Sequence, residues 1–251
     1  METGAEDDQL YSDPELVEFY DLVNSTDRAD HDFCRELAKR ASSVLDLGCG
    51  TGQLAASLAK GRSVTGVDPA RAMLDVARAR PGGEEVTWVE ADARTVRLGQ
   101  SFDLVLLTGH AFQCFLTAVD QLAVLHTIAA HLAPAGQFIF DSRNPHAKEW
   151  LEWTPERSQH TVIHPRLGPV TAWHDTAWNS STGVATYQTH YLAVSTGKHI
   201  TSRSDIAFPA KEGLQSMLAE AGLKAVHWLG DWSGSAYTEA LPEIIPIGRL
   251  G

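Results

Sequence analysis

The feature that most constrains this chain is a glycine-rich turn, G-C-G-T-G at residues 48–52, which lies between two different patterns. Before it, residues 43–47 have the length and apolar character of a buried strand, interrupted only by Asp46. After it, leucines and alanines recur at helical spacing over residues 53–60. Glycines at such a corner allow positive φ and a close approach of a ligand, and the first amides of the helix carry partial positive charge. The stretch predicts a cradle for a nucleotide-containing cofactor.

Spacing separates the possible cofactors. The dinucleotide fingerprint G-x-G-x-x-G requires a glycine where Gln53 stands, so a dinucleotide-dependent oxidoreductase is the less favoured alternative. A second apolar run, residues 63–67, ends in Asp68. A carboxylate at the end of the second strand can accept hydrogen bonds from both hydroxyls of a ribose. The turn and this acid together predict a cofactor that contains a nucleoside.

Two motifs support a resemblance to a known family. The run D-L-G-C-G-T-G, with Asp46 two positions before Gly48, resembles motif I of the class I S-adenosylmethionine (SAM) dependent methyltransferases. The run E-A-D-A at residues 90–93, after the apolar run 86–89, resembles the family's third cofactor motif, in which an acid faces the adenine amino group. The resemblance covers roughly residues 11–145 and 208–250. It implies SAM as the cofactor, methyl transfer as the activity, and these cofactor-binding residues: Tyr20, Asp46, Gly48, Cys49, Gly50, Asp68, Pro69, Met73, Asp92, Ala93, Thr108 and Gly109.

Strand and helix patterns alternate in the first part of the chain. Strands are predicted at 43–47, 63–67, 86–89, 102–107 and 137–140, and helices at 53–60, 69–80 and 121–132. This alternation predicts a parallel, doubly wound sheet, which binds ligands at the carboxyl ends of its strands. A helix at 211–221 and strands at 224–229 and 243–248 return the chain to the sheet. The expected fold is an α/β, Rossmann-like methyltransferase fold with seven strands, mostly parallel.

Between His146 and Phe208 the pattern changes. A short helix is predicted at 147–153, followed by alternating β-branched and aromatic segments at 161–164, 170–178, 184–194 and 199–208, with turn signals between them. Consecutive short strands with tight turns predict an inserted antiparallel β subdomain. The predicted division of the chain is 1–42 for an N-terminal helical cover, 43–145 for the SAM-binding core, 146–208 for the insertion and 209–251 for the return to the core.

The N-terminal cover is predicted from two helical patterns, at residues 11–20 and 30–40. In relatives that act on small molecules, helices of this kind fold over the cofactor, so the resemblance implies that Tyr11 and Tyr20 reach the site. Packing of the two tyrosines as amphipathic residues stays open as the alternative.

A candidate base follows the fourth strand. Residues 108–112, T-G-H-A-F, should lie beside the glycine turn, and the reference pKa of histidine, about 6.5, leaves His110 largely neutral at pH 7 and able to take a proton. Because methyl transfer is a direct displacement that can proceed without a base, a structural role for His110 stays open. The residues expected on the acceptor side are Tyr11, Phe112, Arg143, Asp231 and Tyr237.

Composition narrows the acceptor. With 251 residues and a net charge of -12, the chain is unsuited to binding nucleic acid phosphates or an anionic membrane. The Asp- or Asn-Pro-Pro-aromatic motif typical of nucleic acid amino-methyltransferases does not follow the fourth strand. We expect a small-molecule acceptor, with N or O methylation and oligomeric state undecided. A SAM-binding regulator or scaffold without turnover is the alternative from another class.

Cysteine and histidine usage predicts neither disulfides nor a metal site. The three cysteines include no C-x-x-C pair, and the eleven histidines are dispersed. The sequence also has no signal peptide pattern and no apolar window of about 18 residues. The expected location is the cytoplasm.

Overall fold

The computed structural model describes residues 11, 13–24 and 28–251. One sheet consists of β1 (Ser43–Leu47), β2 (Ser63–Asp68), β3 (Val86–Glu90), β4 (Phe102–Leu107), β5 (Leu132–Phe140), β6 (Ser142–Arg143), β11 (Leu223–Leu229) and β12 (Glu243–Leu250). The other consists of β7 (His160–His164), β8 (Gly168–Asn179), β9 (Val184–Ala193) and β10 (His199–Ala207). The α-helices are α2 (Pro14–Asn24), α3 (Ala29–Leu37), α4 (Gln53–Leu58), α5 (Arg71–Ala79), α6 (Ala118–His131), α7 (Pro155–Ser158) and α8 (Lys211–Glu220). The 3₁₀ turns are η1 (Ala38–Arg40), η2 (Gly83–Glu85), η3 (Ala111–Cys114), η4 (Pro145–Ala147) and η5 (Glu149–Glu152).

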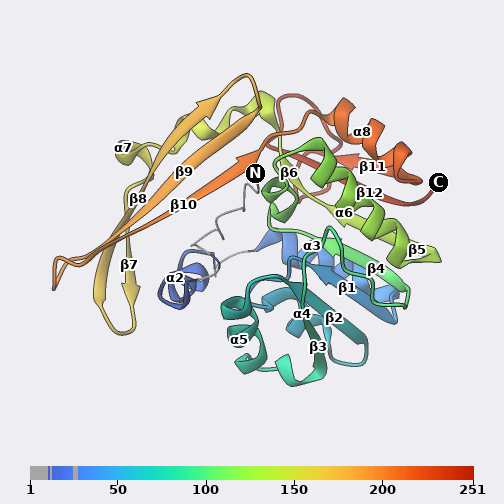
Figure 1. Cartoon of the computed structure of the whole chain (residues 1–251), viewed down its shortest axis with the longest axis horizontal. Helices are drawn as coiled ribbons and strands as arrows, with labels where there is room; N and C mark the ends of the chain where they lie inside the picture. The colour runs from blue at the N-terminus through green and yellow to red at the C-terminus, as the bar shows by residue number, and fades with distance from the viewer. Residues whose placement is uncertain (1–10, 12, 25–27) are drawn as a thin grey trace, which may run out of the picture.

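The topology confirms the predicted fold class. The first sheet has the order β11-β12-β5-β4-β1-β2-β3, with β6 paired to β12, and only β12 is antiparallel to its neighbours (Figure 1). The second sheet is antiparallel with the order β10-β9-β8-β7, and it stands apart from the first (Figure 1). In the ranges that the structure describes, none of the helices has the length and apolar character needed to cross a membrane.

The parallel sheet is buried on both faces. Leu45 and Leu47 of β1 belong to a core cluster that includes residues of α6 and α8, whereas Val44 packs with residues of α3 and α4 on the other face. Successive residues of a strand point to opposite faces, so near-continuous apolar runs are what a central parallel strand requires. The two helical layers leave the carboxyl ends of β1 and β4 accessible to a ligand.

Several elements differ from the prediction in their bounds or type. The helix expected at 121–132 spans Ala118–His131, because Thr117 accepts a hydrogen bond from the Asp120 amide as its N-cap. Strand β5 begins at Leu132 rather than at residue 137, since Pro134-Ala135-Gly136 forms an irregularity within the strand where its register with β4 shifts. The helix expected at 147–153 is a pair of 3₁₀ turns, η4 and η5.

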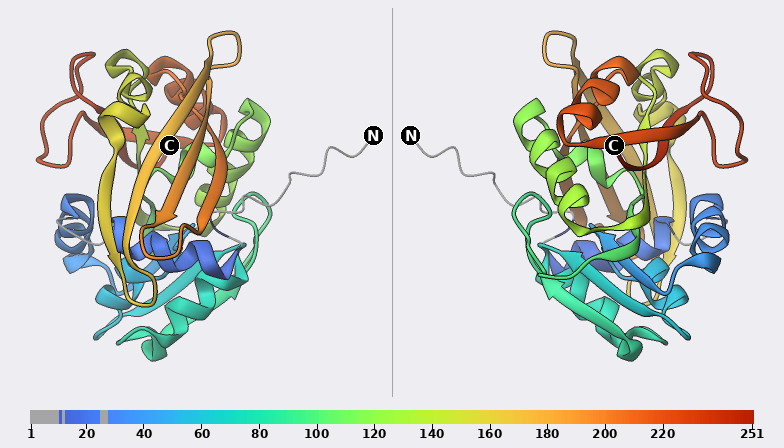
Figure 2. Two further views of the ribbon diagram at one scale, coloured as in Figure 1. Left: turned by 90° about the vertical axis from the view of Figure 1, so that its left-hand side faces the viewer. Right: turned by 90° about the vertical axis from the view of Figure 1, so that its right-hand side faces the viewer.

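Helix α2 joins the two sheets. On one side Asp21 accepts a 2.7 Å hydrogen bond from Thr51 in the glycine turn and forms an ion pair with Arg80. On the other side Phe19 stacks on Tyr191 of β9 with 4.2 Å between ring centroids. Figures 1 and 2 show α2 below the antiparallel sheet, beside the first sheet. The helix therefore fixes the antiparallel sheet relative to the glycine turn.

The fit of Gly52 against β3 gives a stability prediction. Gly52 has φ +72°, and a Cβ there would lie 2.4 Å from Trp88 and 2.7 Å from the Ala77 Cβ. The Trp88 ring is held by a 2.8 Å hydrogen bond to the Gly83 carbonyl, so it cannot yield easily. We expect Gly52→Ala to lower the unfolding free energy by about 2–5 kcal/mol, because left-handed strain adds to overpacking.

The matched control is Gly61→Ala, since Gly61 has φ +76° but no atom within 4 Å of a Cβ. Its loss should be about 1–2 kcal/mol, from strain alone. Urea unfolding curves measure both losses. Equal losses would contradict close packing of the turn on Trp88.

Candidate active site

A cavity lies at the carboxyl ends of β1 and β4, bounded by the glycine turn and the N-terminal helices. Half of the residues predicted to contact the cofactor line it: Tyr20, Asp46, Gly48, Cys49, Thr108 and Gly109. The other lining residues, which the sequence did not single out, are Arg28, His31, Thr51, Gln53 and Leu54. Strands β1 and β4 are hydrogen-bonded neighbours, and this pairing brings residues 48 and 109 to the same wall.

Asp46 places a carboxylate in the wall of this cavity. Its side chain is buried, and no residue in the described part of the chain donates a hydrogen bond to it. Burial raises the pKa of Asp46 to about 7, and the nearby Asp68 adds to the shift. A buried carboxylate in this state is stabilised by a cation that enters the cavity.

Asp68 organises the glycine turn from the end of β2. One of its oxygens accepts the Gly50 amide and the other accepts the Ala70 amide, both at 2.9 Å. Each oxygen of a carboxylate can accept two hydrogen bonds, so one position on each oxygen is left for a ligand. Burial still raises the pKa of Asp68, against the effect of the two amides.

The other residues predicted around the cofactor do not line the cavity. Asp92 is bound by the Arg94 guanidinium, which also contacts Asp120. The Arg94 hydrogen bond holds the pKa of Asp92 below its usual value. Pro69 is exposed, whereas Met73 and Ala93 are buried. Pro69 follows β2, Met73 lies in α5, and Asp92 and Ala93 follow β3. The segment after β3 adjoins Asp68, whose carbonyl accepts the Ala91 amide.

The two predicted tyrosines lie together over the glycine turn. The Tyr20 ring is 3.9 Å from the position of a Cβ on Gly50, so a side chain there would meet the ring. Tyr11 makes an edge contact with Tyr20 at 6.1 Å between centroids. Burial raises the pKa of Tyr20 to about 12, so its hydroxyl stays protonated.

Two cavity residues at the start of α3, Arg28 and His31, escaped the sequence analysis. Arg28 forms a 2.6 Å ion pair with Asp30, and its guanidinium lies 3.3 Å from a Cβ position on Gly109. His31 lines the same cavity with a buried Nδ1 that has no hydrogen-bond partner in the described residues. Burial lowers the pKa of His31 to about 4. In sequence they read as a polar helix start, and only the fold brings them to Gly109.

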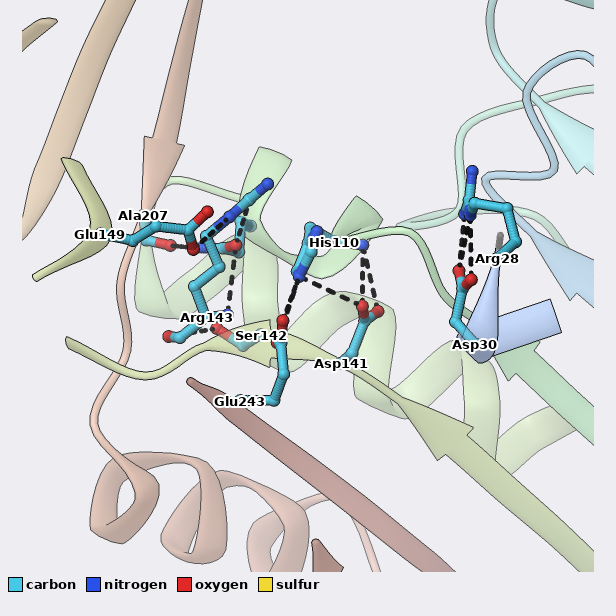
Figure 3. Close-up of polar contacts among 10 residues, drawn as sticks. Arg28, Asp30, His110, Asp141, Ser142, Arg143, Glu149, Ala207 and Glu243 are labelled. Carbon is cyan, nitrogen blue, oxygen red and sulfur yellow. Dashed lines mark hydrogen bonds and ion pairs between the residues drawn. The ribbon is translucent and has the colours of Figure 1, made fainter. Parts of the chain in front are cut away.

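His110 lies between two carboxylates (Figure 3). Its Nε2 is 3.0 and 3.1 Å from the two oxygens of Glu243 on β12, and 3.5 Å from Asp141 after β5. Burial lowers the pKa of His110 to about 4, and it raises that of Asp141 to about 6 and that of Glu243 to about 8. The neutral histidine expected at pH 7 is therefore coupled to an acid 133 residues away, which no local pattern indicated.

Arg143 lies beside this cluster (Figure 3). Its guanidinium pairs with Glu149 at 3.1 Å, donates a 3.0 Å hydrogen bond to the Gln113 side-chain oxygen, and lies over the Trp153 ring at 5.2 Å. The other predicted acceptor-side residues lie elsewhere. Phe112 is fully buried and stacks on Phe140 in the core, Asp231 accepts amides of its own loop, and Tyr237 lies near Lys211 of α8.

The cluster of His110, Asp141 and Glu243 also has the composition of a metal site. One donor atom from each residue lies within 4.8 Å of the others, close enough to hold a cation. The sequence analysis missed this group because its members come from three distant segments. The contacts of Nε2 with Glu243 are of hydrogen-bond length, so a shared proton also accounts for the geometry.

These features fit SAM. The unbonded Asp46 carboxylate suits the cationic part of the cofactor, and the open acceptor positions of Asp68 suit ribose hydroxyls. The glycines of the turn, which have no side chain, let the cofactor approach the backbone.

Comparisons with known proteins agree with SAM as the cofactor. Residues 44–136 match a family model described as a methyltransferase domain. The chain is 25% identical over 240 residues to the cypemycin N-terminal methyltransferase of a Streptomyces species, covering 94% of this chain and 96% of that one. It is 34% identical over 113 residues to the ubiquinone biosynthesis O-methyltransferase of Salmonella arizonae, but this match covers 43% of the chain and 45% of the relative.

The fold has a similar solved structure, a SAM-dependent methyltransferase from Clostridium acetobutylicum, with a TM-score of 0.79 and 16% identity over 94% of this chain and 98% of that one. The motif spacing, the matched domain and the fold lead to the same assignment. The chain is a class I SAM-dependent methyltransferase.

Proposed function

We propose that this enzyme methylates the nitrogen of a small-molecule amine. The observation that carries the proposal is the charge around His110. Three carboxylates, of Asp30, Asp141 and Glu149, act on this region against two guanidinium groups, of Arg28 and Arg143, and Glu243 adds a fourth carboxylate when it is ionised. An excess of acid favours an acceptor that arrives as an ammonium ion over a neutral or anionic one.

The residues have separable roles in this proposal. Asp68 would hold the ribose hydroxyls, and Asp46 and Arg28 would face the charged groups of the methionine part, because they line the cavity. SAM, when bound, supplies a methyl group activated by a sulfonium ion. Helix α2 and the antiparallel sheet exclude water and orient the acceptor. His110 would accept the proton that an ammonium acceptor must lose.

The relatives favour nitrogen over oxygen. The N-terminal methyltransferase matches almost the whole chain, including the region that we propose meets the acceptor. The match to the O-methyltransferase is confined to less than half of the chain. Similarity over the acceptor region bears more directly on the acceptor than similarity over the cofactor motifs alone.

The test is a set of paired acceptors. Each pair contains an amine, such as an amino sugar or a peptide with a free N-terminus, and the compound in which a hydroxyl replaces that amine. We expect methylation of at least one amine and at least about tenfold slower methylation of its hydroxyl partner, measured as initial rates by mass spectrometry. Preferential methylation of the hydroxyl compounds would contradict the proposal.

Asp46 gives a prediction about cofactor binding and pH. Its raised pKa, about 7, means that much of it is protonated near neutrality, whereas a cation in the cavity favours the ionised form. We expect SAM binding to release protons at about pH 6.5 and almost none at about pH 9, where Asp46 is already ionised. Calorimetry in buffers of different ionisation enthalpy measures the release. Asp46→Asn should abolish it, and release that persists in this variant would contradict the assignment.

A further inference from the structure

The two nitrogens of the His110 ring have different surroundings. Nε2 contacts both oxygens of Glu243 at 3.0 and 3.1 Å. Nδ1 has no hydrogen-bond partner in the part of the chain that the structure describes, and it points away from the carboxylates in Figure 3. About a quarter of the side chain, 24%, is exposed. One nitrogen is held by the protein and the other is open to a ligand.

The backbone of His110 is held independently of the ring. Its amide donates to both oxygens of Asp141 at 3.1 Å, and Asp141 is buried at the end of β5. The φ of His110 is +62°, a left-handed conformation that costs a residue with a Cβ about 1–2 kcal/mol. Gly109, which lines the cavity, directly precedes it. Asp141 thus sets the position of the residue, and Glu243 sets the orientation of the imidazole.

The shared proton decides which nitrogen can act as a base. Burial lowers the pKa of His110 and raises that of Glu243, so near neutral pH the pair holds one proton beyond the one that a neutral imidazole carries. If that proton lies on Glu243, it bonds to Nε2 and the ring hydrogen is on Nδ1. If it lies on the ring, both nitrogens carry hydrogen. Nδ1 gains a free lone pair only when the pair loses this proton, and Nε2–H then donates to the Glu243 carboxylate.

We propose that Glu243 is a positioning residue: by holding Nε2, it makes Nδ1 the reactive nitrogen of His110. The role of Nδ1 as a base rests on the proposed function, amine methylation. The proton of the incoming ammonium passes to Nδ1. The freed lone pair of the acceptor forms the N–C bond as the C–S bond of the methyl group breaks, and the positive charge of the sulfonium reappears on the methylated ammonium. The Glu243 carboxylate stabilises the imidazolium meanwhile, as carboxylates do in other carboxylate–histidine pairs.

Other charged groups near His110 come from several elements. Those whose charges act on it are Asp30 of α3, Asp141 after β5, Arg143 of β6 and Glu149 of η5. Arg143 and Glu149 pair with each other, as do Arg28 and Asp30, so their effects partly cancel. Two carboxylates approach the ring nitrogen Nε2 itself. Asp141 lies 3.5 Å from Nε2, and Glu243 lies closer, at 3.1 Å or less.

The test uses nitrogen-15 NMR of the full chain with EDTA, which reports the protonation of each ring nitrogen between about pH 5 and 10. Comparison with His110→Gln identifies the signals. We expect Nδ1 to carry the ring hydrogen at low pH, while Nε2 accepts the proton of Glu243. As the pair loses its shared proton, near pH 8, the ring hydrogen should move from Nδ1 to Nε2. In Glu243→Gln the step near pH 8 should vanish, whereas Glu149→Gln, which removes a nearby carboxylate that does not contact the ring, should keep it.

Three results would overturn the proposal: a ring hydrogen that stays on Nδ1 through this step, an unchanged step in Glu243→Gln, or displacement of the shared proton by stoichiometric Mg²⁺, Mn²⁺ or Zn²⁺ added in place of EDTA. The last would mean that the three side chains form a metal site. If Glu243→Gln does not fold, the first and third readouts in the wild type still decide. None of these readouts needs an acceptor, so the failure of this proposal is distinct from failure to find an amine substrate.

Discussion

Asp68→Asn should bind SAM about a hundredfold more weakly than the wild type, or worse. The carboxylate has one acceptor position left on each oxygen, and hydrogen bonds of this charged kind contribute about 1.5–3 kcal/mol each. The amide NH₂ of asparagine would also face a backbone N–H of Gly50 or Ala70, so one donor would be left without an acceptor. The loss should appear in calorimetric titrations with SAM at constant pH.

The control for Asp68→Asn is Asp103→Asn. The Asp103 carboxylate also accepts two backbone amides, those of Ser42 and Ser43, but at the opposite end of β4. This substitution should cost stability without changing the affinity for SAM. Equal losses of affinity in the two variants would show that Asp68 acts only through the stability of the sheet.

His110→Gln should slow methyl transfer to an amine by about 100- to 10,000-fold in single-turnover experiments, the range of a positioned general base. The difference from the wild type should be greatest at about pH 8.5, because the His110–Glu243 pair has lost its shared proton there and Nδ1 can accept another. It should shrink at a higher pH, where the acceptor amine is already neutral.

Replacement of His227, an exposed histidine on the edge strand β11, is the control and should leave the rate unchanged. Rapid-quench measurements with enzyme in excess from about pH 6 to 10 cover the relevant range. A His110→Gln rate within a few-fold of the wild type throughout would mean that His110 has only a structural role.

The glycine turn and its two neighbouring strands were predictable because their constraints are local. The turn needs glycine at fixed positions, Asp68 ends the strand that pairs with β1, and parallel strands bring their carboxyl ends to one edge. The alternating segments after His146 likewise predicted an antiparallel sheet from side-chain periodicity. In each case the information lies within a few residues of the element concerned.

The remaining parts of the site depend on distant contacts. Glu243 meets His110 only because β12 inserts between β5 and β11, so no spacing in the chain indicates the pair. Arg28 and His31 reach the cavity through the packing of α3 against the sheet. Phe112 was expected to face the acceptor because it follows the fourth strand, but η3 turns its ring into the core beside Phe140. Tertiary packing decides these positions.

Transfer of a labelled methyl group tests the central claim most directly. The enzyme would be incubated with SAM that carries a deuterated methyl group and with the amine acceptors, and the products would be fragmented in the mass spectrometer. We predict that the label appears on nitrogen, with one S-adenosylhomocysteine formed for each methylated product. Label on oxygen would contradict the proposed acceptor, and tight SAM binding without any S-adenosylhomocysteine would contradict methyl transfer itself.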